Sequence, residues 1–115
     1  MILMPSAKIL VCHRRLFNED QPRFFVGTIS ACEDGLVKVT GFSWTRDPVQ
    51  GFVRKQDERT KVISLTSGAL IVYELPSELL IEDLRIEQGA GHAVVLSDGR
   101  KFRMDLAERL APGHL

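Results

Sequence analysis

A run of aromatic and basic side chains is the part of the sequence best suited to binding chemistry. Its members are Trp44, Arg46, Arg54, Lys55, Arg59 and Lys61. Single-stranded nucleic acids bind where bases can stack on flat rings and phosphates can pair with guanidinium and ammonium groups. The pattern therefore predicts a contact with single-stranded RNA at these side chains. The alternative is a solvated loop in which Asp47, Asp57 and Glu58 neutralise the neighbouring cations.

The histidines and cysteines show no pattern typical of catalysis or metal binding. His13, His92 and His114 have no acidic partner at a suggestive spacing. Cys12 and Cys32 are twenty residues apart without a Cys-x-x-Cys motif, and each lies in an apolar run where a thiol behaves as a small hydrophobe. We therefore expect no catalytic residue, no metal site, no cofactor and no enzymatic activity.

The composition is that of one ordinary globular domain. Of the 115 residues, 44% are hydrophobic and 26% are charged. We expect a single domain over residues 1–115, with a core at residues 8–75 and a C-terminal extension at residues 76–115. The N-terminal sequence MILMPSAK has no basic region, and Pro5 interrupts its apolar run. Neither a signal peptide nor a membrane span is therefore expected, and the predicted location is the cytoplasm.

The charges are balanced in number but unevenly distributed. The formal net charge is zero, so the chain lacks the basic excess typical of proteins that bind duplex DNA. Residues 46–61 carry five basic and three acidic side chains, a net charge of +2. Residues 74–115 carry five basic and eight acidic side chains, a net charge of −3. A basic loop and an acidic tail can form a contact surface, although solvated charge explains the same pattern.

Two Asp-Gly dipeptides predict the hairpins that must position these side chains. Residues 24–45 read FFVGTISACEDGLVKVTGFSWT, with Asp34-Gly35 between two runs rich in β-branched and aromatic residues. Asp-Gly suits the type I′ turn, which needs positive φ at both central positions. This turn predicts the pairs Glu33–Leu36, Ile29–Thr40, Gly27–Phe42 and Phe25–Trp44. A second two-residue turn at Asp98-Gly99 predicts the pairs Val95–Phe102 and Ala93–Met104.

Both faces of the first predicted hairpin are apolar. One face carries Phe25, Ile29, Ala31, Leu36, Phe42 and Trp44. The other carries Phe24, Val26, Cys32, Val37 and Val39. A ribbon of this kind curls into a small barrel, or has its second face covered by another element or subunit. Gly27 and Gly41 come almost opposite each other, which indicates a bulge or a sharp bend.

The remaining chain predicts further strands and little helix. Strands are expected at residues 8–17, at 60–75 with an interruption at 66–68, and from residue 84 onward. Residues 46–59 are expected to form an exposed loop or a hairpin tip. Short irregular elements are expected as a turn at 18–22, a helix at 77–82, a turn at 89–91, a helical turn at 104–110 and a frayed end at 111–115. The predicted core includes Phe25, Ile29, Phe42, Val95 and Phe102.

Two segments together resemble the signature motifs of the Sm and Sm-like RNA-binding proteins. The first-motif positions are occupied by Gly27, Ile29, Glu33, Leu36 and Thr40. The second-motif positions are occupied by Gly68, Ile71, Val72 and Tyr73. The resemblance covers residues 24–75, and the basic residues 46–59 fall where the family has its variable loop. Val37 and Ser67 stand where the family has its uridine-contacting asparagine and the arginine before the second-motif glycine.

The resemblance implies an all-β fold, namely a small, strongly bent antiparallel barrel of the Sm-like or SH3-like type, here with a C-terminal hairpin extension. It also implies subunits that join edge to edge in a ring. The uncharged run ALIVY at residues 69–73 independently favours a homo-oligomer, because such a run on an exposed edge invites pairing with another chain. The alternative is an interior strand covered by residues 84–105. We expect an RNA-binding module first, a protein-protein assembly or adaptor domain second, and an enzyme third.

Overall fold

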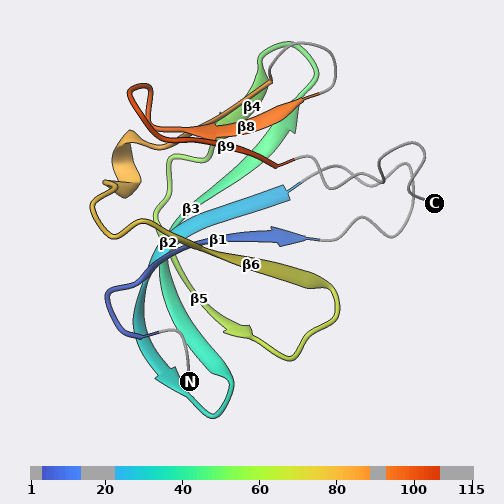
Figure 1. The fold of residues 1–115 in the computed structure, drawn as a ribbon. Coiled ribbons are helices and arrows are strands. Elements are labelled where there is room, and N and C mark those ends of the chain that lie inside the picture. Colours follow the sequence, from blue (N-terminus) through green and yellow to red (C-terminus); the bar gives the residue numbers. More distant parts are fainter. Residues whose placement is uncertain (1–3, 14–22, 89–92, 107–115) are drawn as a thin grey trace, which may run out of the picture.

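The computed structural model describes residues 4–13, 23–88 and 93–106, and these form an antiparallel all-β fold (Figure 1). This confirms the predicted all-β class. The strands are β1 (Lys8–His13), β2 (Arg23–Glu33), β3 (Leu36–Asp47), β4 (Gly51–Arg54), β5 (Arg59–Ser64), β6 (Leu70–Leu75), β7 (Arg85–Gln88), β8 (Val94–Ser97) and β9 (Arg103–Asp105). The single short 3-10 helix among the described residues is η1 (Ile81–Asp83), at the end of the segment for which a helix was predicted.

Six strands form one strongly curled sheet: five follow the order β4-β3-β2-β1-β6, and the sixth, β5, pairs with β3 beside β4. The long strand β3 pairs with β5 along its first half, from Leu36 to Gly41, and with β4 along its last residues, from Trp44 to Asp47. Residues 46–59 therefore form a hairpin tip, one of the two alternatives expected. No ladder joins β5 to β6 among the described strands, so the sheet does not close into a barrel there.

The inner face of the curled sheet holds one of two apolar clusters, here called the inner core. Two strands at opposite edges of the sheet contribute to it, β5 through Ile63 and β6 through Leu70 and Val72. Their meeting in one cluster shows how far the sheet curls. The cluster's buried members come from β1, β2, β3 and β5, and are Ile9, Val11, Phe25, Ile29, Val37, Val39 and Ile63. Burial of this apolar area is the main force that keeps the curl.

The opposite face of the same sheet is covered by the chain's own C-terminal part. Strands β7, β8 and β9 form a second antiparallel sheet (Figure 1), and β7 lies against β4. The apolar residues between the two sheets, here called the outer core, are Leu10, Cys12, Phe24, Val26, Trp44, Leu75, Leu79, Leu84, Ile86, Leu96 and Leu106. The two apolar faces expected for the central hairpin are thus both buried within one chain, one inside the curled sheet and the other beneath the second sheet.

The turn of the central hairpin was predicted correctly, but most of its register was not. Asp34 and Gly35 have φ values of 49° and 79°, and Glu33 pairs with Leu36 as expected. A β-bulge then inserts an extra residue between Ile29 and Ala31. The bulge shifts every following pair by one position.

The shifted register reassigns side chains to faces. The observed pairs are Ile29–Val39, Gly27–Gly41, Phe25–Ser43 and Phe24–Trp44. Phe25 and Ile29 therefore share the inner core with Val37 and Val39, whereas Trp44 joins Phe24 in the outer core. The five expected core residues divide accordingly: Phe25, Ile29 and Val95 are buried, whereas Phe42 and Phe102 are half-buried.

The second Asp-Gly dipeptide does not form the predicted two-residue turn. Gly99 has the expected positive φ of 77°, but residues 98–102 all lie between the strands. One Asp98 carboxylate oxygen accepts hydrogen bonds from the backbone N–H groups of Arg100 (2.8 Å) and Phe102 (3.1 Å). This side-chain capping stabilises a longer loop. The observed ladder consequently pairs Val95 with Asp105, Leu96 with Met104 and Ser97 with Arg103.

Several expected features fall outside the described residues. They are the end of the first strand beyond His13, the turns at 18–22 and 89–91, the helical turn beyond residue 106, the frayed end at 111–115, and His92 and His114. The start of that predicted helical turn is wrong, because residues 104 and 105 belong to strand β9 and pair with β8.

Candidate nucleic-acid interface

The six side chains expected to form the site lie on two different faces of the curled sheet. Neighbouring side chains of a strand point to opposite faces, and directly paired residues share a face. Arg54 pairs with Trp44, and Arg46 pairs with Phe52, which packs on the outer core. Arg59 pairs with Gly41 and Lys61 pairs with Val39, a residue of the inner core. The outer face therefore carries Trp44, Arg46 and Arg54. The inner face carries Arg59 and Lys61, together with Lys55, whose backbone N–H bonds to Ser43.

The outer-face group offers no open ring for a stacked base. Trp44 is only 8% exposed and is packed within the outer core. The Arg54 guanidinium carbon lies 4.4 Å from the centre of the Phe42 ring, so a cation already covers that ring. The stacking contribution expected from Trp44 is thus not available in this structure.

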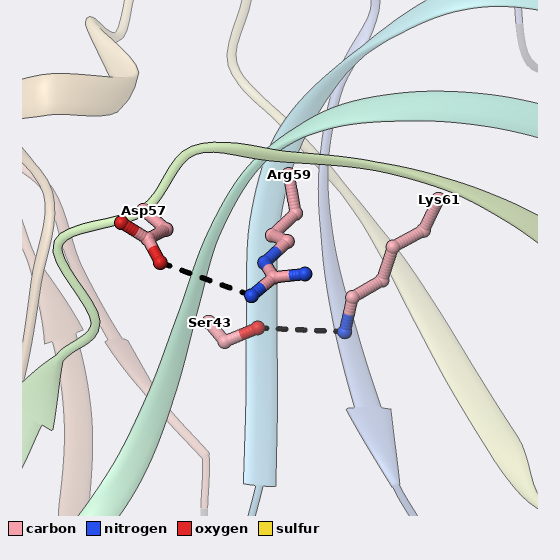
Figure 2. A network of polar contacts seen from close by, with 4 residues as sticks. All are labelled: Ser43, Asp57, Arg59 and Lys61. Atoms are coloured by element: carbon pink, nitrogen blue, oxygen red, sulfur yellow. Dashed lines mark hydrogen bonds and ion pairs between the residues drawn. The ribbon is translucent and has the colours of Figure 1, made fainter.

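Lys61 is the best-defined cation on the inner face. It pairs with Val39 but reaches along β3, so its ammonium group donates a hydrogen bond to the Ser43 hydroxyl at 3.4 Å (Figure 2). The side chain therefore runs past Gly41, where no side chain blocks its path. The same ammonium lies 4.6 Å from the centre of the Phe25 ring, in cation–π contact. Lys61 is held by two interactions above the edge of the inner core.

Other positive side chains surround this ammonium group. Partial burial lowers the pKa of Lys61, and the nearby charges of Arg23, Arg59 and Lys55 lower it further. The backbone N–H of Lys55 donates to the Ser43 carbonyl at 2.8 Å, which places Lys55 directly beside Ser43 on the inner face. A positive charge this close to others raises the free energy of the charged state.

His13 belongs to the same surface. Partial burial lowers the pKa of its imidazole, followed by the charges of Arg23 and Lys61. His13 lies two residues after Val11 on β1, and Arg23 lies two residues before Phe25 on β2. Residues two apart on a strand share a face, so both point to the same side as the inner core. We call the surface formed by His13, Arg23, Lys55, Arg59 and Lys61 the basic face.

Within the described residues, one ion pair within 4 Å involves a cation of the basic face. The Asp57 carboxylate lies 3.8 Å from the Arg59 guanidinium, and both side chains are largely solvent-exposed (Figure 2). Solvent screening makes an exposed pair of this kind worth little. The basic face therefore keeps most of its positive charge.

Arg23 and His13 were not predicted as site residues because they lie outside the continuous stretch at residues 44–61. The alternation of the two strands contained the signal, since Ile9, Val11 and His13 share one side of β1. Arg23 stands before Phe24-Phe25 and therefore shares a side with Phe25. Only the pairing of β1, β2, β3 and β5 brings these positions next to Lys61.

A hollow beside η1 does not indicate a ligand class. Its volume is about 490 Å³, and its charged lining residues are Glu78, Asp83, Asp98, Arg100 and Lys101. These charges nearly balance, unlike those of the basic face.

Within residues 4–13, 23–88 and 93–106, no three His, Cys, Asp or Glu side chains gather in a way that could hold a metal ion. No helix in the described part of the chain has the length and apolar content needed to cross a bilayer.

The chain was compared with protein-family models, with curated proteins and with solved structures. None of the three comparisons found a match.

Proposed function

We propose that this protein is a non-enzymatic module that binds single-stranded RNA on its basic face. The observation that supports this most directly is the strand pairing that places Arg23, Lys55, Arg59 and Lys61 on one face, where the first three also destabilise the charged form of Lys61. Like charges held this close raise the free energy of the unliganded protein. A phosphate placed among them would remove that repulsion, so the arrangement favours an anionic ligand.

A single-stranded ligand fits this surface better than a duplex. The chain has a formal net charge of zero, without the overall basic excess of duplex-binding proteins. The basic face lies on the inner side of a curled sheet, where a flexible strand can follow the curvature. The resemblance of residues 24–75 to the Sm and Sm-like motifs supports RNA as the nucleic acid. We also propose that the curled sheet is of the Sm-like or SH3-like type and that the protein is located in the cytoplasm.

Fluorescence anisotropy with a labelled 20-nucleotide single-stranded RNA tests the proposal. Affinity should fall as salt rises, because phosphate contacts release counterions. Lys61→Ala and Arg23→Ala should each weaken binding and reduce the salt slope by about one unit. Arg85→Ala, an exposed cation on β7 in the other sheet, is the matched control and should leave binding unchanged. Thermal melting of each variant separates loss of binding from loss of fold.

The outcome that contradicts RNA binding is equally clear. Wild-type protein that shows no salt-dependent binding at low ionic strength would remove this function. So would a Lys61→Ala variant that binds as tightly as Arg85→Ala and wild type.

We further propose that the subunits assemble edge to edge, as the Sm-like resemblance implies. Within the described strands, β5 pairs only with β3 and β6 pairs only with β1, so each has one edge without a partner strand. Val62, on β5 itself, is an exposed apolar side chain. An unpaired β5 edge on one subunit can receive the β6 edge of the next, and head-to-tail contacts that close form a ring. The same edges support the alternative function, an assembly or adaptor domain that binds no nucleic acid.

A further inference from the structure

We infer that the basic face recognises the phosphate chain of its ligand and is indifferent to the identity of the bases. The inference rests on the proposed RNA binding and deepens it, because it defines the ligand class as a flexible chain of phosphates. Three features of the structure support it: the position of every described aromatic ring, the chemistry of the side chains on the basic face, and their spacing.

The first feature is the lack of an open phenylalanine, tyrosine or tryptophan ring on this surface among the described residues. Phe25 is the aromatic residue of the inner core nearest to the cations, and it is only 2% exposed. The Lys61 ammonium occupies its ring face at 4.6 Å. A base could stack there only after Lys61 moved away, which would also break its hydrogen bond to Ser43. Base-dependent binding to single strands usually relies on such stacking.

The other described aromatic rings belong to the opposite face of the curled sheet. Phe24 and Trp44 are buried in the outer core, and Phe52, Tyr73 and Phe102 pack against it. The ring of Phe42 is covered by the Arg54 guanidinium. The described part of the chain therefore supplies no phenylalanine, tyrosine or tryptophan ring to stack a base beside Lys61.

The second feature is the hydrogen-bonding chemistry of the basic face. Distinguishing all the bases requires acceptors as well as donors, because the amino groups of adenine and cytosine are read by carboxamide, carboxylate or backbone acceptors. The side chains that define the basic face are guanidinium, ammonium and imidazole groups. Of the acceptors near these cations, the Ser43 hydroxyl accepts from Lys61, and the Asp57 carboxylate lies 3.8 Å from the Arg59 guanidinium. Donors dominate this surface, and phosphate oxygens are the acceptors they fit.

The third feature is the spacing of the cations. Arg59 and Lys61 are two residues apart on β5, so their backbone positions repeat at roughly 7 Å along one face. Arg23 reaches the same region from β2 and acts on Lys61 through its charge. Cations distributed along and across strands suit several phosphates in a row better than one compact anion. This arrangement makes a chain of phosphates the ligand class.

Three kinds of probe test the inference by fluorescence anisotropy and competition. The first is a set of labelled 20-nucleotide oligo-U, oligo-A and oligo-C strands. The second is an abasic oligomer of the same length, which keeps the phosphates and sugars without the bases. The third is inorganic polyphosphate as an unlabelled competitor. We expect the dissociation constants of the strands and the abasic oligomer to agree within about threefold, because phosphate contacts carry no sequence information.

Variants link this result to the basic face. Lys61→Ala should weaken binding of all the oligomers by the same factor, and Arg85→Ala should weaken none. Polyphosphate should displace every strand from wild-type protein. Binding of one homopolymer more than tenfold tighter than the others, or loss of binding to the abasic oligomer, would overturn the inference while leaving RNA binding intact.

The remaining outcomes separate the inference from the function on which it rests. Binding of the abasic oligomer and polyphosphate without binding of any RNA would overturn the proposed function and support recognition of the phosphate chain. Binding of none of the probes would overturn both.

Discussion

Gly27 lies directly opposite Gly41 in the β2–β3 ladder, at a point where the two strands approach too closely for side chains. A Cβ atom added at Gly41 would lie 2.5 Å from the Gly27 Cα and still closer to the Val26 carbonyl oxygen. One added at Gly27 would lie 2.6 Å from the Thr40 carbonyl oxygen. The glycine pair thus marks a close backbone approach, while the predicted bulge lies nearby at residues 29–31.

Gly41→Ala should destabilise the protein by about 1–3 kcal/mol, because the new methyl group meets backbone atoms that cannot move independently. Chemical denaturation followed by circular dichroism measures this loss. Gly68→Ala is the matched control, since an added Cβ there meets nothing within 4 Å and its φ is not positive. Equal stability of the two variants would show that the strands separate easily at this point.

Ile29→Ala should lower the free energy of unfolding by about 2–4 kcal/mol, as expected for a large-to-small change in a packed core. Ile29 is 1% exposed and belongs to the inner core. Val62→Ala is the control, because Val62 is 64% exposed and should change stability by less than about 0.5 kcal/mol. A melting temperature for Ile29→Ala within a degree or two of wild type would contradict the assignment of Ile29 to the core.

Gly35→Val should cost more than about 1 kcal/mol of stability, since a β-branched residue tolerates the φ of 79° at this position poorly. Gly35→Asn should cost less, because asparagine enters the left-handed region more readily. Denaturation midpoints of the two variants provide the comparison. A valine variant as stable as the asparagine variant would show that the turn can adopt another conformation.

RNA affinity should increase as the pH falls from about 7.5 to 6. In the unliganded protein, burial and the charges of Arg23 and Lys61 lower the pKa of His13 below its ordinary value of 6.5. A bound phosphate favours the imidazolium and raises that pKa, so binding takes up protons in this range. Uptake of one proton limits the change in affinity to about tenfold per pH unit.

His13→Gln should remove most of this pH dependence in anisotropy titrations. The stability of the unliganded protein should depend on pH in the opposite direction. Because the pKa of His13 is lowered in the folded state, the unfolded chain binds more protons. The contribution of His13 to the free energy of unfolding is therefore full above pH 6.5 and declines as the pH falls through the folded-state pKa. The same pH slope of affinity for His13→Gln and wild type would exclude His13 from the ligand response.

Val62→Lys should weaken self-association without unfolding the subunit. Val62 is an exposed side chain on the edge strand β5, so the substitution places a charge at the proposed contact while sparing both cores. Light scattering on a sizing column measures the mass of wild type and variant at micromolar concentration. Glu82→Lys, an exposed position on η1, serves as a charge control. A wild-type protein that elutes as a monomer would rule out edge-to-edge assembly at that concentration.

The sequence by itself determined the features that depend on neighbouring residues. Asp34-Gly35 forms the expected turn because only residues that tolerate positive φ fit its two central positions. The alternation of apolar residues was enough to predict an all-β fold with two apolar faces on the central hairpin, because side chains of a strand point alternately to opposite sides.

Tertiary structure decided the register, the faces and the candidate site. The position of the bulge after Ile29 was not predictable from local propensity, and a shift of one residue moved Trp44 from a predicted stacking platform into the outer core. The capping of the loop at 98–102 by Asp98 likewise replaced a two-residue turn that its Asp-Gly dipeptide favoured equally well. His13, Arg23 and Lys61 come together only because β1, β2, β3 and β5 pair across long sequence separations, and such pairing depends on the packing of the whole sheet.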